Sequence, residues 1–189
     1  MDTWESLKTE CGTCSLCDLC RTRTNLVFGT GCENSRLMFI GEGPGEQEDL
    51  QGEPFVGPAG QLLNTMLEII GLDRSRVYIA NMVKCRPPRN RDPQENELCS
   101  CRDWLERQIA LVDPAIIVCL GRIAASGIIR EDFRITREHG QWFDLGGRRC
   151  MATYHPSALL RDTSKRPEAF MDFKSLQKEL RSLCPEIFL

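Results

Sequence analysis

The stretch LMFIGEGPG at residues 37–45 joins an apolar run of strand length to a glycine-rich, acidic turn. Three further apolar runs, at residues 77–80, 116–120 and 150–154, also end at a polar residue or a glycine. The residues that follow the four runs are Gly41, Asn81, Gly121 and His155. In an open parallel α/β sheet, ligands bind just outside the carboxyl ends of the strands. The pattern therefore predicts that the four strand ends share one crevice and one active site.

Amphipathic segments separate these apolar runs. Apolar side chains recur at helical spacing in residues 58–70, 96–112, 123–129 and 167–183. Alternation of apolar strands with amphipathic helices is typical of a parallel sheet that helices cover on both faces. Three glycines within residues 135–149 predict a hairpin or a looped insertion before the fourth strand. We expect one domain over residues 1–189, an α/β fold of three layers (α/β/α sandwich) around a mainly parallel four-stranded sheet.

Charge and hydropathy exclude several classes of protein. The 189 residues carry 27 acidic and 24 basic side chains, which argues against a surface that binds nucleic acid all over but permits a local basic patch. No apolar run approaches the ~18 residues that cross a bilayer, and the N-terminus has no apolar segment of the kind that directs export. We expect a cytoplasmic monomer without a membrane partner.

Eleven cysteines without an export signal favour metal ligation over disulfides, because the cytosol keeps thiols reduced. Two groups stand out: Cys11, Cys14, Cys17 and Cys20 near the N-terminus, and Cys85, Cys99 and Cys101 in the middle of the chain. A closed site needs four ligands, and the first group lacks the C-x3-C-P that ends the ferredoxin pattern. We therefore expect two ligands from each group. An all-thiolate site suits either Zn²⁺ or an iron–sulfur cluster, and the residues alone leave that choice open.

The glycine-rich turn does not have the pattern of a dinucleotide-binding loop. The third glycine of G-x-G-x-x-G would fall at Glu46, and the acidic side chains around it would repel a pyrophosphate. We therefore reject nucleotide binding. Glycines that only shape a tight turn are the alternative for this segment.

A basic loop, KCRPPRNR at residues 84–91, follows Asn81. Its four cations suit phosphates, and its two prolines keep it extended; a solvated run of charge is the alternative. The chain has two histidines. His155 follows an apolar strand, where chemistry is expected, whereas we expect His139 at the surface.

Four motifs carry a resemblance to a known enzyme family. They are GEGPGEQED at residues 41–49, PFVGPAGQLLN at 54–64, NMVKCRPP at 81–88 and HPSALLR at 155–161. In this order they resemble the family 4 uracil-DNA glycosylases, over nearly the whole chain. The resemblance implies a [4Fe–4S] cluster held by Cys14, Cys17, Cys85 and Cys101, the first two placed by their spacing before Arg23.

The resemblance also implies the roles of the pocket residues. Phe55 is expected to stack on a flipped uracil, Asn81 to hydrogen-bond its Watson–Crick edge, and His155 to lie near its O2. Gly41 and Gly43 are also expected to bind the uracil. An amide held in place can pair with uracil O4 and N3–H but leaves polar groups unpaired against cytosine. A histidine donor stabilises the negative charge that builds on the departing base.

The first motif departs from that of other uracil-DNA glycosylases. They have a water-positioning aspartate where this chain has Gly43, so we expect Glu42, and after it Glu48, to be the catalytic carboxylate. They have a tyrosine that excludes the methyl group of thymine where this chain has Gly45, so Glu48 or the loop backbone is expected to exclude it. A relative that traps uracil covalently carries a K-R-R-I-H insertion, which residues 86–94 lack, so we expect ordinary turnover.

The resemblance implies a monofunctional DNA-repair hydrolase. It would flip deoxyuridine out of single- or double-stranded DNA, hydrolyse the N-glycosidic bond and leave an abasic site, with least cost at mismatches and in single strands. The expected DNA contacts are Lys84, Arg86, Arg89, Asn90, Arg91 and Arg161. The alternative is a non-catalytic iron–sulfur or zinc module that binds nucleic acid, which would leave Asn81 and His155 without a purpose. A sliding-clamp partner has no support in the sequence.

Overall fold

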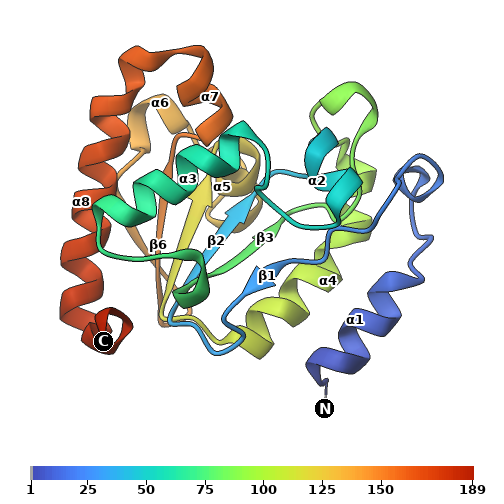
Figure 1. Ribbon diagram of the computed structural model, residues 1–189, viewed down its shortest axis with the longest axis horizontal. Helices are drawn as coiled ribbons and strands as arrows, with labels where there is room; N and C mark the ends of the chain where they lie inside the picture. Colours follow the sequence, from blue (N-terminus) through green and yellow to red (C-terminus); the bar gives the residue numbers. More distant parts are fainter. Residues whose placement is uncertain (1) are drawn as a thin grey trace.

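The centre of the computed structural model, which describes residues 2–189, is a six-stranded sheet with the order β1-β3-β2-β4-β6-β5 (Figure 1). Its four inner strands run parallel: β3 (Tyr78–Asn81), β2 (Leu37–Gly41), β4 (Ile116–Leu120) and β6 (Arg148–Thr153). The edge strands β1 (Thr30–Gly31) and β5 (Trp142–Leu145) pair antiparallel with their neighbours. The parallel α/β sheet is confirmed, but the expected count of four strands is wrong. β1 has two residues, too few to show a period, and β5 is the first arm of the expected hairpin.

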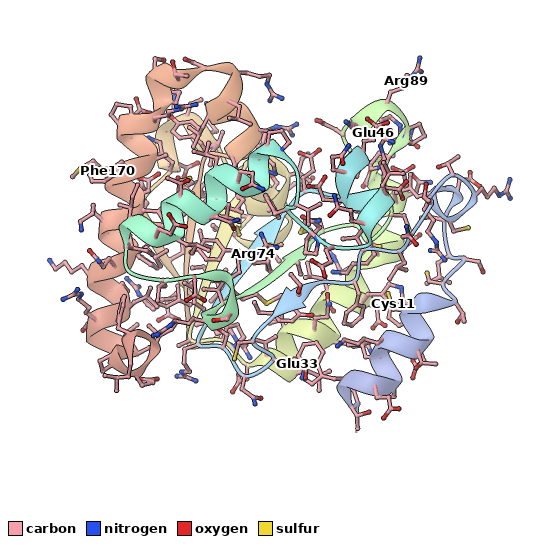
Figure 2. All side chains as sticks on the ribbon, in the orientation of Figure 1. Cys11, Glu33, Glu46, Arg74, Arg89 and Phe170 are labelled. Atoms are coloured by element: carbon pink, nitrogen blue, oxygen red, sulfur yellow. The ribbon has the colours of Figure 1, made fainter. Side chains whose placement is uncertain are left out.

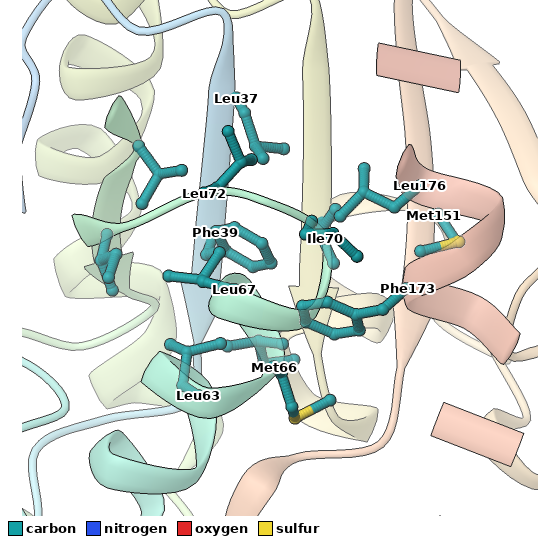
Figure 3. Packing of buried hydrophobic residues seen from close by; sticks show 14 of the residues in the cluster. Leu37, Phe39, Leu63, Met66, Leu67, Ile70, Leu72, Met151, Phe173 and Leu176 are labelled. Carbon is teal, nitrogen blue, oxygen red and sulfur yellow. The ribbon is translucent and has the colours of Figure 1, made fainter. Parts of the chain in front are cut away.

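Helices cover both faces of the sheet, as the alternating pattern predicts. On one face lie α3 (Pro58–Ile69), α7 (Pro156–Arg161) and α8 (Arg166–Leu183), and on the other α4 (Glu95–Val112) and α5 (Arg122–Ile128). β2 shows how one strand serves both faces. Leu37 and Phe39 enter the core with α3 and α8 (Figure 3), and Met38 and Ile40 enter the core with α4 and α5.

Several short elements escaped the sequence pattern. They are α1 (Trp4–Gly12), α2 (Glu46–Gln51), α6 (Ile135–Glu138) and the 3₁₀ turns η1 (Asp18–Arg21), η2 (Arg74–Arg76), η3 (Pro88–Asn90), η4 (Thr163–Lys165) and η5 (Pro185–Phe188). Most are a turn or two long, so few apolar residues can mark a buried face. None of the helices within residues 2–189 is long and apolar enough to span a membrane.

A smaller apolar cluster joins the N-terminus to the body of the protein. α1 lies beside α4 (Figure 1), and Leu7 and Cys11 of α1 pack with Val83, Cys85 and Trp104. The segment that carries the first group of cysteines is thereby placed next to the basic loop and the start of α4.

Candidate active site

A cleft of about 450 Å³ opens at the carboxyl ends of the four parallel strands. Glu42 and Gly43 reach it from β2, Asn81 from β3, Gly121 from β4 and His155 from β6. Its lining also includes Glu48, Phe55, Asn90, Arg91 and Arg161. The separate motifs of the sequence therefore meet at one place, at the carboxyl ends of the strands, where the site was predicted.

Asn81 presents a hydrogen-bond acceptor that has no partner. The residue is 2% exposed, and its Oδ1 makes no hydrogen bond within residues 2–189. Gly41 lies opposite on β2, where a β-carbon would stand 2.4 Å from this Oδ1 and 2.7 Å from the Phe55 ring. Gly41 thus makes room for both side chains without lining the cleft itself. A buried acceptor left unpaired costs about 1–3 kcal/mol, so the amide suits a ligand that donates a hydrogen bond.

His155 is held as a neutral donor. Its Nδ1 accepts the Ser157 N–H at 3.1 Å and lies 2.8 Å from the Ser157 hydroxyl. Burial, together with the nearby charge of Arg161, lowers the pKa of His155 to about 4. Because Nδ1 is an acceptor, the single proton of the neutral ring resides on Nε2. The residue can therefore donate a hydrogen bond through Nε2 at neutral pH while carrying no charge.

Glu42 is a carboxylate with a raised pKa inside the cleft. The pKa of Glu42 is raised to about 7, chiefly by burial and also by the charge of Asp92, and this rise outweighs the opposing charges of Arg122 and Arg161. A group that titrates near the working pH is suited to accept a proton in catalysis. Glu42 therefore has the electrostatic setting expected of the water-activating base.

Glu48 is committed to holding the chain in front of α3. Its Oε1 accepts the N–H groups of Val56 at 2.9 Å and Gly57 at 2.8 Å. A proton acceptor in catalysis needs a lone pair free for water. The Oε2 of Glu48 accepts no hydrogen bond within residues 2–189 and keeps such lone pairs. The preference for Glu42 as the base therefore rests on its raised pKa, while the two hydrogen bonds of Oε1 make Glu48 a fixed part of the wall.

Phe55 holds a left-handed backbone conformation, with φ at 56°. This region costs a residue with a side chain roughly 1–2 kcal/mol. The side chain is 6% exposed, and its ring centroid lies 5.5 Å from that of His155, with the two planes inclined by 31°. A flat apolar surface beside a hydrogen-bonding edge suits a planar ligand with a polar rim.

The basic loop lies at one rim of this cleft. Arg89 and Asn90 have φ angles of 56° and 54°, and Arg89 projects from the molecule at the tip of the loop (Figure 2). Arg86 donates to the Asn90 amide oxygen at 2.7 Å. Arg91 donates two hydrogen bonds to the Glu97 carboxylate, at 2.7 and 2.9 Å. No carboxylate within residues 2–189 forms an ion pair with Arg89. Its charge is thus the most available one in the loop.

The prediction that Lys84 contacts DNA is wrong. Its side chain is 1% exposed, and its Nζ donates to the Asn81 main-chain oxygen at 2.8 Å and to the Gln108 Oε1 at 2.5 Å. An ammonium buried beneath the strand end cannot reach a phosphate. The prediction failed because the first cation of the run, Lys84, is buried, whereas the later ones follow at the surface. The buried ammonium holds the main-chain oxygen of Asn81.

Six thiols surround a small pocket between the N-terminal segment and α4. They belong to Cys11, Cys14, Cys17, Cys20, Cys85 and Cys101. Four of these sulfurs have an N–H donor nearby, which is the environment that stabilises a ligating thiolate. The pairs are Trp104 Nε1 with Cys14 (3.3 Å), the Leu19 N–H with Cys17, Arg23 with Cys85 (3.1 Å) and the Lys84 N–H with Cys101 (3.4 Å). These four are the ligands that the resemblance implies.

The donor chemistry of these thiols bears on the kind of metal centre. Zn²⁺ and iron–sulfur clusters are both held by four cysteine thiolates. The thiols around this pocket therefore fit an all-thiolate centre of either kind.

The expected surface position of His139 is wrong. The side chain is 20% exposed, its Nδ1 lies 2.9 Å from Asp172, and its ring packs 4.7 Å from that of Tyr154. Tyr154 in turn lines the cleft. The sequence held no signal for this arrangement, because the carboxylate partner comes 33 residues later, on α8.

Other residues of the cleft were also missed. Asp92 and Arg122 both line it and form an ion pair at 2.7 Å. Arg122 directly follows Gly121 at the end of β4, so its position carried the same signal as Asn81 and could have been used. Asp92 had none, because it sits beyond the basic loop.

Comparisons with known proteins agree with the resemblance seen in the four motifs. A model of the uracil DNA glycosylase superfamily matches residues 28–181. A type-4 uracil-DNA glycosylase of Archaeoglobus fulgidus is 43% identical over 196 residues, which cover all of this chain and 98% of the relative. One of Thermotoga maritima is 46% identical over 153 residues, 80% of each chain. A type-5 uracil-DNA glycosylase of Pyrobaculum aerophilum is 33% identical over 149 residues, 70% of this chain and 66% of the relative. The chain therefore belongs to the uracil DNA glycosylase superfamily, among its type-4 members.

Proposed function

We propose that this protein excises uracil from DNA by flipping deoxyuridine into the cleft and hydrolysing its N-glycosidic bond. The observation that carries the proposal is the unpaired, buried Oδ1 of Asn81, which faces a cleft that also holds the neutral donor of His155 and the ring of Phe55. This set matches a flat base with an N–H donor on its pairing edge and carbonyl acceptors beside it.

Recognition of uracil rests on the amide of Asn81. Its Oδ1 accepts the N3–H of uracil, and its NH₂ donates to O4. Cytosine presents an amino donor and an unprotonated N3 at these positions, so both contacts would fail. Sites that leave buried polar groups unpaired against the wrong ligand discriminate strongly. We assign the exclusion of thymine to Glu48, because its two backbone hydrogen bonds prevent it from yielding to a methyl group.

Bond cleavage divides between His155 and Glu42. As the bond between C1′ and N1 breaks, its electron pair moves onto uracil, and the His155 Nε2–H stabilises the negative charge at O2. Water adds to C1′ and passes a proton to Glu42. The uracil anion then takes up a proton, and Glu42 gives up the one that it accepted, so that the products are uracil and an abasic sugar. Neither residue becomes covalently attached, which agrees with the expected turnover.

The rim supplies affinity for DNA. Phosphate contacts position a protein without reading the sequence. We assign these contacts to Arg86, Arg89, Asn90, Arg91 and Arg161. The last three line the cleft, Arg89 projects at the tip of the basic loop, and Arg86 donates to the Asn90 amide oxygen. Single strands and mismatched duplexes are the favoured substrates, because a base there loses less stacking on extrusion.

We assign a [4Fe–4S] cluster to Cys14, Cys17, Cys85 and Cys101. The four N–H donors around their sulfurs support this assignment. Such a cluster ties the N-terminal segment to the basic loop, so its contribution is chiefly structural. We further propose that residues 1–189 act as one domain and as a monomer in the cytoplasm, where thiols stay reduced.

The function is tested by incubation with an oligonucleotide that contains one uracil, followed by alkali, which breaks the strand at abasic sites. We expect cleavage at the uracil position and none in matched strands with thymine or cytosine. Binding of the uracil strand without any alkali-sensitive site would contradict the proposal and favour a non-catalytic module.

Replacing Asn81 with Asp is expected to change base choice. Asn81→Asp removes the NH₂ donor for O4 and adds an acceptor for the cytosine amino group. The free-energy barrier to uracil excision should rise by about 1–3 kcal/mol, the cost of one unpaired buried group. The difference between the excision rates of uracil and cytosine should narrow. Single-turnover rates on both substrates give the measurement. Asn90→Asp, which changes a second amide of the lining, is the control and should leave base choice intact.

Removing two arginines of the basic loop is expected to weaken DNA binding at every sequence. Arg86→Ala with Arg89→Ala should reduce the slope of log K against log salt by about 0.9 for each phosphate that is no longer neutralised, while the preference for uracil stays. Binding titrations at several salt concentrations provide the check. Lys178→Ala on α8 is the control, since this exposed residue lies far from the loop (Figure 1). An unchanged slope in the double variant would remove the loop from the interface.

The cysteine assignment separates ligands from bystanders. Protein purified without air should be brown and contain iron and sulfide, and Cys14→Ser should lose both and unfold at a lower temperature. Cys20→Ser, in the same pocket, should keep them. Iron and sulfide analysis with thermal unfolding measures both effects. Colourless protein with stoichiometric zinc, or loss of iron from Cys20→Ser alone, would contradict the assignment.

A further inference from the structure

Arg74 holds the backbone of the residue that forms the flat wall of the cleft. It lies in η2, between α3 and β3, and does not line the cleft. Its Nη1 donates to the Phe55 carbonyl at 2.9 Å, and its Nη2 to the Pro54 carbonyl at 2.6 Å. Figure 2 labels Arg74 just below α3 in the view, and the residue is half-buried. Two consecutive carbonyls are thus gripped by one planar guanidinium.

The N–H groups that follow Phe55 in the same segment are also held by a charged side chain. The Glu48 carboxylate accepts the N–H groups of Val56 and Gly57. Gly60 completes the arrangement, because a β-carbon there would lie 1.7 Å from the Phe55 carbonyl oxygen. The carbonyls before the turn and the N–H groups after it are therefore both fixed by charged side chains. A left-handed residue such as Phe55 persists only where its surroundings determine the conformation in this way.

The backbone conformation of Phe55 decides where its ring goes. A change of φ from the left-handed region to an ordinary value would swing the bond from Cα to Cβ and carry the ring away from Gly41 and His155, which it now contacts. The cleft would then lose its flat wall.

We infer that Arg74 is a positioning residue for base stacking, which acts on uracil only through the Phe55 ring. The inference rests on the proposed function for the identity of the stacked base. The guanidinium of Arg74 donates to two carbonyls at once. A lysine cannot reproduce this geometry, because its ammonium is a point charge.

A double-mutant cycle tests the inference. Arg74→Ala, Phe55→Ala and the double variant are compared by single-turnover excision of uracil and by the inhibition constant of free uracil, with iron content and circular dichroism as checks of folding. Arg74→Ala should lower the excision rate by roughly 10- to 100-fold, the scale of a misplaced binding group, and weaken inhibition by uracil. In a protein that already carries Phe55→Ala, adding Arg74→Ala should change neither the excision rate nor the inhibition constant of uracil. Arg74→Lys should show the same pattern to a smaller degree and replaces Arg74→Ala if that variant does not fold.

Arg76→Ala is the matched control. Arg76 lies on the same 3₁₀ turn and donates to a distant carbonyl, that of Ile187, at 2.9 Å. Its removal should lower the melting temperature and leave excision unchanged. Equal effects of Arg74→Ala with and without the Phe55 ring would overturn the inference, as would an Arg74→Ala enzyme that melts earlier but excises normally. Absence of excision by the unaltered protein would instead refute the proposed function, so the two failures are distinct.

Discussion

Glu42→Gln is expected to lower the single-turnover rate of uracil release by roughly 10²- to 10⁴-fold, the range for loss of a general base. The carboxylate lines the cleft, and its burial raises its pKa to about 7, so it can take a proton from water at neutral pH. The amide keeps the size of the side chain but accepts no proton. Binding of uracil-containing DNA should change little, because the base is read by Asn81.

The pH dependence gives an independent check on Glu42. The ionised carboxylate is the active form, so the rate of the unaltered enzyme should rise with pH and level off above about 7, and Glu42→Gln should remove that rise. The contribution of Glu42 to the stability of the fold should instead decrease as the pH rises. A carboxyl whose pKa is higher in the folded than in the unfolded protein destabilises the fold once both are ionised. Glu42→Gln should therefore raise the melting temperature at pH 8 and leave it nearly unchanged at pH 4.

Glu48→Gln separates the two candidate carboxylates. Its remaining carbonyl oxygen can still accept the N–H groups of Val56 and Gly57, so the wall of the cleft should persist. We expect a smaller loss of rate than for Glu42→Gln and an unchanged pH profile. A larger loss in Glu48→Gln, or a pH profile that survives Glu42→Gln, would reverse the assignment.

Strand ends could be predicted from the sequence because hydrophobic runs are local signals. β4 was predicted to the residue, and β2 to within one residue, and the polar residues after them needed only the rule that parallel strands end at one edge. The cleft followed from the same rule. Asn81 and His155 lie in it because each comes directly at the end of such a run.

Burial and pairing across distant segments were beyond the reach of these signals. Lys84 reads as one more cation of a basic loop, yet it points inward, where Gln108, 24 residues later, accepts a hydrogen bond from its Nζ. Arg74 reads as a turn residue, although it holds the carbonyl of Phe55, 19 residues earlier. No local pattern marks such a contact. The chemistry of a residue type predicts what it can bind, whereas the fold decides what it meets.

His155→Ala is expected to lower the single-turnover rate by roughly 10²- to 10³-fold, about 2.7–4 kcal/mol, by analogy with the loss of one oxyanion-hole donor. The Ser157 N–H fixes the acceptor role of Nδ1, so the Nε2–H is the only donor that the neutral ring offers. Charge on the departing uracil is larger in the transition state than in the bound substrate. The loss should therefore fall on the rate, while the dissociation constant of the DNA changes much less.

The neutral state of His155 gives the last test. Its pKa of about 4 means that the ring stays uncharged across the range in which Glu42 titrates, so His155 should contribute no ionisation to the pH profile between about pH 5 and 9. His139→Ala is the matched control, because it removes the other histidine, which packs behind Tyr154 without lining the cleft. It should lower the melting temperature and spare the rate. A His155→Ala enzyme that cleaves within a few-fold of the unaltered protein would show that charge on the leaving base is stabilised elsewhere, and an ionisation near 6.5 that disappears in this variant would show that the imidazolium, not the neutral ring, is the donor.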